Sequence, residues 1–229
     1  MMIESVIALD QQCTLYLNGS TSLFWDGAIS AATATVTWIP LMLVLLYLLI
    51  KNNNLSRLGL IILMVGCCIL LADQVASGIC KPYFQRFRPT NDLSLMHLVD
   101  VVDGYRGGKY GFFSSHAANT FSVAVFFSLL VRHRIITTLL LSWAILNGYT
   151  RIYLGVHYCG DVLVGTIWGC IVGAIVYLFY RYIVKDNTKV NYISSQYTTT
   201  GYLVEDIRIV EFVTLLSFFY ILVRGALYN

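Results

Sequence analysis

The sequence predicts an all-α, polytopic membrane helix bundle, and three observations support that prediction. Of the 229 residues, 58% are hydrophobic and only 12% are charged, whereas soluble domains contain about 45–50% apolar and about 25% charged residues. The mean hydropathy is +0.71. Apolar runs also recur with lengths close to the roughly 20 residues that a helix needs to cross a bilayer. Because only helices satisfy their own backbone in lipid without closing a barrel, we expect every span to be helical.

The first 28 residues predict an interfacial helix rather than a span. Apolar side chains are mixed there with acidic and amide side chains, and the helix is expected to end near Asn18-Gly19. About six spans follow, and we expect them in one membrane domain, 1–229, at about 29–50, 58–80, 112–131, 135–150, 161–183 and 209–227.

Charged and polar residues between the apolar runs mark the ends of these spans. Lys51 and three asparagines end the first span, and Lys81 follows the second. The run Arg132-His133-Arg134 separates the third span from the fourth. A short connection at 151–160 leads into the fifth span, and a polar tract at 184–208 precedes the sixth.

The composition also excludes several classes of protein. An ordinary soluble enzyme and a disordered chain are both too poor in apolar residues to match. The net charge is only +3. A nucleic-acid binder would show a larger positive charge clustered on one face. Six cysteines show no metal-ligand spacing, so we expect no structural metal site.

The distribution of Lys and Arg predicts which side of the membrane each loop faces. The first 28 residues contain three acidic residues and no basic residue, and Lys51 directly follows the first span. Because Lys and Arg favour cytoplasmic loops, the 51–57 loop is expected in the cytoplasm and the N-terminus outside. The segments 81–111 and 151–160 then face the periplasm or the outside of the cytoplasmic membrane.

Three clusters of reactive residues are expected on that same outer side. The first is Lys81-x6-Arg88-Pro89, the second is Phe113-Ser114-Ser115-His116, and the third is Thr150-Arg151-x5-His157-x3-Asp161. All three lie at the ends of spans, so the topology allows them to meet. The long polar segment 81–111 would then be the active-site loop.

The cations and serines in these clusters suit the binding of phosphate. Lys81, Arg88 and Arg151 are three positive charges at the membrane edge, and Arg binds phosphoryl oxygens in a bidentate manner. Ser114 and Ser115 are expected at a helix N-cap, where hydroxyls and backbone amides are available to an anion.

The two histidines suit catalysis. His157 and Asp161 are four residues apart, so on a helix the carboxylate would orient the imidazole. His116 is a second imidazole that can act as general acid for a leaving oxygen. A set of acidic metal ligands is missing beside them, so the cations would carry the charge stabilisation.

The three clusters, in this order, resemble the motifs of the type 2 phosphatidic acid phosphatase superfamily, which includes lipid phosphate phosphatases and vanadium haloperoxidases. The family pattern is K-x6-R-P, then P-S-G-H, then S-R-x5-H-x3-D. This chain matches the first motif fully, and it has Phe113 for Pro, Ser115 for Gly and Thr150 for Ser. A backbone conformation that only Gly adopts cheaply would be strained at Ser115.

The resemblance implies a metal-independent phosphatase without a cofactor, acting on a lipid phosphate in the bilayer. It implies that His157 attacks phosphorus and forms a phosphohistidine, that Asp161 orients His157, and that His116 protonates the leaving oxygen and then activates water. The non-bridging oxygens would be held by Lys81, Arg88, Arg151, Ser114 and Ser115.

The sequence is compatible with several lipid phosphate substrates. A polyprenyl, undecaprenyl-type diphosphate is the first expectation, and phosphatidylglycerophosphate, phosphatidate and the phosphates of lipid A are alternatives. A non-catalytic lipid-binding or transport bundle is the alternative from another class. The intact set of His116, Arg151, His157 and Asp161 favours the enzyme. The oligomeric state has no signal in the sequence.

Four further residues lie near these motifs or inside a span. Asp73 lies about two turns inside the second span and is expected to form a structural hydrogen bond with a neighbouring span. Arg86, taken alone, is expected to snorkel to the membrane edge. Cys80 and Cys159 lie on the same side, and a disulfide between them is not expected.

Overall fold

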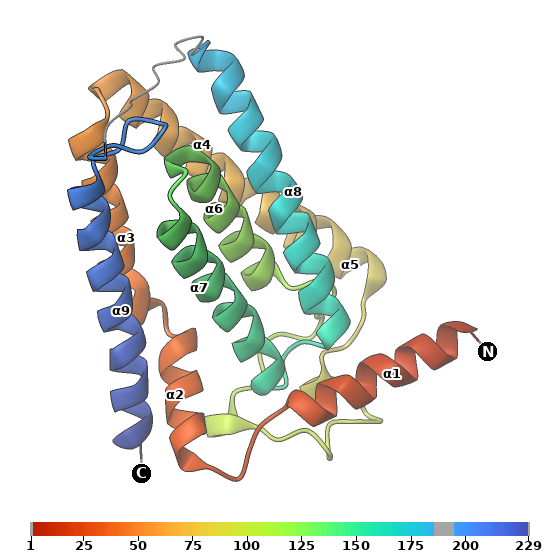
Figure 1. Ribbon diagram of the computed structural model, residues 1–229. Coiled ribbons are helices and arrows are strands. Elements are labelled where there is room, and N and C mark those ends of the chain that lie inside the picture. The colour runs from red at the N-terminus through yellow and green to blue at the C-terminus, as the bar shows by residue number, and fades with distance from the viewer. Residues whose placement is uncertain (1, 186–194, 229) are drawn as a thin grey trace.

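The computed structural model describes residues 2–185 and 195–228, and its helices pack into an elongated bundle (Figure 1). No strand occurs among these residues, so the predicted all-α class is confirmed. The π-helix Gln74–Cys80 joins α4 to α5. The α-helices are α1 (Met2–Leu17), α2 (Leu23–Thr33), α3 (Thr35–Asn52), α4 (Leu55–Asp73), α5 (Lys81–Phe84), α6 (Ser115–Val131), α7 (Arg134–Tyr153), α8 (Cys159–Val184) and α9 (Val204–Ala226).

Several of these helices are long and apolar enough to span a bilayer. Four stretches of the described chain meet that length and composition, namely Thr35–Asn52, Leu55–Phe84, Cys159–Val184 and Val204–Ala226. The apolar helix α6 has 17 residues, and α7 packs against α6, α8 and α9 within the same bundle. The chain is an integral membrane protein, as its composition predicts.

The N-terminal part of the chain differs from the expected single span at 29–50. Helix α1 ends at Leu17, as expected near Asn18, but a second helix, α2, then begins at Leu23. It is separated from α3 by Ala34, whose backbone is extended (φ −72°, ψ 125°). Helices α2 and α3 both pack against α9. The expected span is therefore two helices with a break between them.

A stripe of glycines allows α6 and α8 to approach closely. A Cβ added at Gly169 would lie 2.4 Å from the backbone oxygen of Ala118, and one at Gly165 would lie 2.5 Å from that of Ser114. Small residues at a helix interface let two backbones meet in a membrane. Because the contact continues to the N-terminal ends of both helices, it brings the beginning of α6 beside the beginning of α8.

The two ends of the bundle hold different connections, as the sequence predicts. Helix α1 lies across one end, beside the loop that follows α5 (Figure 1). At the other end the hydroxyl of Thr200 donates to the carbonyl of Val131 at 2.8 Å, and the N–H of Leu203 donates to Asn52 Oδ1 at 2.8 Å. Of the polar tract 184–208, residues 186–194 lie outside the described part.

Candidate active site

The spacing of the third motif forms a tight turn that fixes His157. The backbone N–H groups of Val156 and His157 both donate to the carbonyl of Arg151 at 3.1 Å. Arg151 lies in the last turn of α7 rather than in the connection 151–160, because α7 continues to Tyr153. The six-residue step from Arg151 to His157 therefore reverses the chain and places both side chains at one end of the bundle.

His157 is buried and faces a carboxylate. Its side chain is 1% exposed, and its Nδ1 atom lies 3.5 Å from Asp161 Oδ2, with Asp161 itself fully buried. The same carboxylate oxygen accepts the N–H of Tyr158 at 3.2 Å, which caps the first turn of α8. Asp161 therefore faces the Nδ1 side of the ring and leaves the Nε2 side for chemistry.

Burial and charge keep the His157 imidazole neutral at pH 7. Burial is the largest cause that lowers the pKa of His157, Arg88 and Arg151 lower it as well, and Asp161 raises it, so that the pKa is about 4. A neutral imidazole has a free lone pair on one nitrogen. The site thus supplies a nucleophile without first removing a proton.

Lys81 reaches the beginning of α6. Its Nζ donates to Ser115 Oγ at 3.1 Å and to Ser77 Oγ at 3.0 Å, and Ser77 in turn donates to Asp73 Oδ1 at 3.1 Å. The expected hydrogen bond from Asp73 to a neighbouring span is therefore wrong, because its partner lies one turn later on the same helix. Through Ser77, Asp73 contributes negative charge beneath Lys81.

Arg88 is held by the segment that ends the loop. Its N–H donates to the carbonyl of Lys109 at 3.2 Å and its Nε to the carbonyl of Tyr110 at 3.1 Å. Gly107 has a φ of +66°, and a Cβ there would lie 2.6 Å from Arg88 Nη1. A glycine is needed at this position both for the backbone and for the close approach.

Arg151 is buried with unused donors. Its side chain is 3% exposed, and its Nε and Nη2 atoms have no hydrogen-bond partner. Buried guanidinium donors without partners are costly. An anion at this place would supply the missing acceptors.

The two serines differ in what they offer. Ser114 is the N-cap of α6; it is fully buried, its Oγ accepts the N–H of Ala117 at 3.4 Å, and its own N–H donates to the carbonyl of Asp161 at 3.0 Å. Its amide is therefore not free for a phosphate. Ser115 faces Lys81 and does not have the positive φ that would favour Gly, so the departure from the family pattern costs no backbone strain.

Arg86 belongs to the site, although its sequence position suggested only snorkelling. Its Nη1 lies 2.8 Å from Asp161 Oδ1, and its Nη2 lies 2.6 Å from Asp10 Oδ2 on α1. Its guanidinium carbon also lies 3.8 Å from the centre of the Tyr158 ring. Burial opposes the charge of Arg86, but Asp161 and Asp10 outweigh it and raise its pKa.

Asp10 and a second residue of α1, Thr14, also cap the start of α8. The N–H of Gly160 donates to Asp10 Oδ1 at 2.7 Å, and the N–H of Cys159 donates to Thr14 Oγ1 at 3.0 Å. Helix N-termini leave such donors without intrahelical partners. A spacing rule cannot find Asp10, since 76 residues separate it from Arg86.

Cys159 and Cys80 are free thiols.

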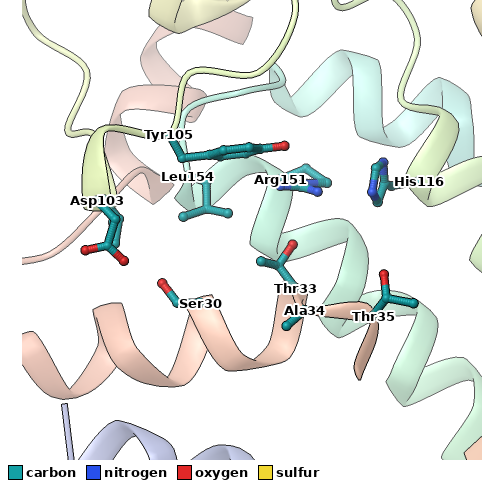
Figure 2. Close-up of a pocket in the computed structure, with 10 residues that line it drawn as sticks. Ser30, Thr33, Ala34, Thr35, Asp103, Tyr105, His116, Arg151 and Leu154 are labelled. Atoms are coloured by element: carbon teal, nitrogen blue, oxygen red, sulfur yellow. The ribbon is translucent and has the colours of Figure 1, made fainter. Parts of the chain in front are cut away.

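A cavity of about 330 Å³ opens beside His116 and Arg151. Figure 2 shows these two side chains in one row with Tyr105, opposite a second row that comes from the break between α2 and α3. His116, the second residue of α6, is exposed to this space. His116 and Arg151 therefore both line this cavity, whereas His157 is buried and paired with Asp161.

A buried histidine–carboxylate pair beside several cations suits a membrane enzyme that transfers phosphoryl groups. The chain belongs to the PAP2 superfamily, whose model matches residues 57–185. That match includes all three motifs. The predicted family and the predicted lipid phosphate hydrolase activity are both confirmed, which sets aside a non-catalytic bundle.

Two relatives are named lipid A 4'-phosphatase. The chain is 40% identical over 180 residues to the one from Bacteroides thetaiotaomicron, covering 78% of this chain and 79% of the relative. It is 36% identical over 180 residues to the one from Porphyromonas gingivalis, covering 79% and 76%.

A solved structure has the same fold. The PAP2 type phosphatidylglycerolphosphate phosphatase from Bacillus subtilis matches with a TM-score of 0.60 and 21% identity, covering 78% of this chain and 88% of that one. At this identity the match supports the fold and not the substrate.

Proposed function

We propose that this membrane phosphatase hydrolyses the 4'-phosphate of lipid A, acting as a single domain over residues 1–229. The observation that carries the chemistry is the buried, neutral His157, which is paired with Asp161 and lies near Arg88 and Arg151. The observation that carries the substrate is that the two relatives described above bear this activity in their names. Neither relative supports undecaprenyl diphosphate, the first expectation from sequence.

The reaction we propose has two steps. His157 Nε2 attacks phosphorus, the bond between phosphorus and the sugar oxygen breaks, and His116, which the bound phosphate dianion would keep in its doubly protonated form, gives one proton to that oxygen. In the second step His116 takes a proton from water, the water oxygen attacks phosphorus, and the bond to Nε2 breaks. Inorganic phosphate leaves, and both histidines return to their starting protonation states.

The charges in the site suit this sequence of bonds. Negative charge on the non-bridging oxygens is greatest during each transfer, and Lys81, Arg88 and the unpartnered donors of Arg151 would stabilise it. Ser115 would add a hydroxyl beside Lys81. Ser114 would act by holding the first turn of α6. No bound metal is required for this charge balance.

Arg86 and Asp10 act as positioning residues in this proposal. Arg86 bonds the Asp161 oxygen that does not face His157, so it holds the plane of the carboxylate. Asp10 holds Arg86 from the other side. The interfacial helix α1 is thereby connected to the nucleophile through three side chains.

We further propose that the protein lies in the cytoplasmic membrane with this site on the periplasmic face. The acidic, base-free N-terminal segment and the position of Lys51 support that orientation. The substrate would stay anchored in the outer leaflet while its phosphate enters the end of the bundle.

The experiment that tests the function measures phosphate release by the purified protein in detergent. The panel contains lipid A, undecaprenyl diphosphate, phosphatidylglycerophosphate and phosphatidate. Lipid A is expected to have the highest kcat/KM and to lose its 4'-phosphate. A preference for any other member would reject the substrate while leaving the chemistry intact.

A second experiment tests the covalent step. His157→Ala should lower kcat by at least about 10³-fold. When the wild type is quenched within the first turnover, substrate labelled with ³²P should leave label on the protein that is stable to base and released by acid, because both histidines are intact and the phosphohistidine forms before water attacks it. Label of the same stability in His157→Ala would contradict the mechanism.

A further inference from the structure

The break between α2 and α3 is a built feature of the fold. At a break, carbonyl groups lose their helical partners, and two side chains replace those partners here. Thr37 Oγ1 donates to the carbonyl of Ala31 at 2.7 Å, and Trp38 Nε1 donates to the carbonyl of Ala32 at 2.7 Å. Both side chains are buried. Extended backbone at Ala34 is therefore stabilised rather than frayed.

The break forms one wall of the cavity beside the catalytic residues. Ser30, Thr33 and Thr35 line it with their hydroxyl-bearing side chains, and Figure 2 shows them opposite Tyr105, Arg151 and His116. Its volume of about 330 Å³ is near the lower end of ligand pockets, which is about 300 Å³. That space is suited to one small polar ring rather than to a large lipid.

A carboxylate completes the lining. Asp103 lies at the edge of the cavity, and its Oδ1 accepts a hydrogen bond from the hydroxyl of Tyr228, which holds the side chain in place. Its second oxygen remains available as an acceptor. The cavity thus combines a fixed acceptor with several hydroxyls that both donate and accept.

The reactive end of the cavity fixes how a substrate would lie. The unpartnered donors of Arg151 and the exposed ring of His116 would hold the phosphate. The group that bears the phosphate would then extend between the two rows of Figure 2. An acyl or prenyl chain in that place would bury hydroxyls without partners, which is unfavourable.

We propose that this cavity is the subsite for the sugar ring that carries the phosphate, with Ser30, Thr33, Thr35 and Asp103 bonding ring hydroxyl or amide groups. The proposal rests on the proposed function and adds the residues that select the substrate. A polyprenyl diphosphate has no such ring groups, so this lining would give it no hydrogen bonds.

The test removes hydroxyls while keeping the shape of the wall. The variant Ser30→Ala/Thr33→Val is compared with the wild type and with Thr138→Val, a matched control whose exposed hydroxyl bonds the carbonyl of Arg134 within α7. Thr33→Val removes one acceptor of the Thr150 hydroxyl, which lies 3.4 Å from Thr33 Oγ1. The Thr150 hydroxyl keeps a hydrogen-bond partner, because it also donates to the carbonyl of Asn147 at 2.7 Å. Two quantities are measured for each protein, the KM for lipid A and the inhibition constant of orthovanadate, which needs only the phosphate-binding groups.

The double variant is expected to raise the KM for lipid A about tenfold, because two hydrogen bonds of ordinary strength are lost. The inhibition constant of orthovanadate should stay within about twofold of the wild type, and Thr138→Val should change neither. An unchanged or lower KM would overturn the subsite, as expected if the cavity holds a lipid chain. An equal rise in the KM for lipid A and in the inhibition constant of orthovanadate would also overturn the subsite. If the wild type releases no phosphate from lipid A, the proposed function itself fails.

Discussion

Arg86 lies 2.8 Å from the Asp161 oxygen that faces away from His157, and a second carboxylate, Asp10, holds the same guanidinium at 2.6 Å. A planar guanidinium that bonds two carboxylates fixes their relative positions better than an ammonium does. Helix α1 is thus linked to the His157–Asp161 pair through Asp10 and Arg86.

Replacing Arg86 should affect catalysis through His157. In Arg86→Gln, Asp161 loses its cation and its fixed orientation, so kcat should fall about 10²-fold, as for a small misplacement of a reacting group. The pKa of His157 should rise, because a nearby positive charge is removed while Asp161 remains. Arg86→Lys should restore part of the lost kcat and bring the pKa of His157 part of the way back to its wild-type value. A drop in kcat with an unchanged pKa would show that Arg86 only supports folding.

The pKa of His157 is itself a prediction. Burial lowers it to about 4 from the ordinary value of 6.5, so the imidazole should stay neutral as the pH falls to about 5 and gain its proton only around pH 4. The measurement is an NMR titration of the ¹⁵N-histidine-labelled protein in detergent. Comparison with His157→Gln assigns its signal among the four histidines of the chain. Protonation near pH 6.5 would contradict the buried, cation-rich site.

The approach of α6 to α8 should depend on Gly169. Gly169→Ala places a Cβ 2.4 Å from the carbonyl oxygen of Ala118, and overpacking of this kind costs about 1–3 kcal/mol. Gly66→Ala is the matched control, since a Cβ there meets nothing within 4 Å. Thermal unfolding in detergent should show a lower Tm for Gly169→Ala only. Equal Tm values for the two variants would mean that the helices can separate without loss.

Activity should survive removal of metal ions. Within residues 2–185 and 195–228, no group of three or more His, Cys, Asp or Glu side chains is arranged to hold one, and the proposed charge stabilisation comes from Lys and Arg. Phosphate release should therefore be unchanged in EDTA. Orthovanadate should inhibit, because it adopts the five-coordinate geometry of the transfer. Loss of activity in EDTA with rescue by Mg²⁺ would reject the mechanism.

The sidedness of the site is testable in intact cells. Ser94 is exposed in the loop that follows α5, and Lys185 is exposed at the far end of α8. Ser94→Cys should react with an impermeant thiol reagent in intact cells, whereas Lys185→Cys should react only after lysis. The background lacks Cys80, Cys159 and the exposed Cys13. The reverse pattern would place the site in the cytoplasm.

Local patterns in the sequence predict the class of the fold and most of the proposed catalytic groups. Apolar runs between charged residues are local signals, and they mark helices α4 and α6 to α9 because lipid accepts little else. The motif spacings are local as well, since a helical turn sets the distance from His157 to Asp161 and a tight turn sets that from Arg151 to His157.

Contacts between segments that are distant in the chain appear only once the helices are packed. Asp10 meets Arg86 because α1 crosses the end of the bundle, and no local pattern around either residue records that contact. The break at Ala34 was hidden inside one apolar run, since hydropathy does not sense the side-chain hydrogen bonds of Thr37 and Trp38 that stabilise it. Packing in three dimensions therefore chose the positioning residues and the shape of the cavity, while the order of residues had already supplied the chemistry.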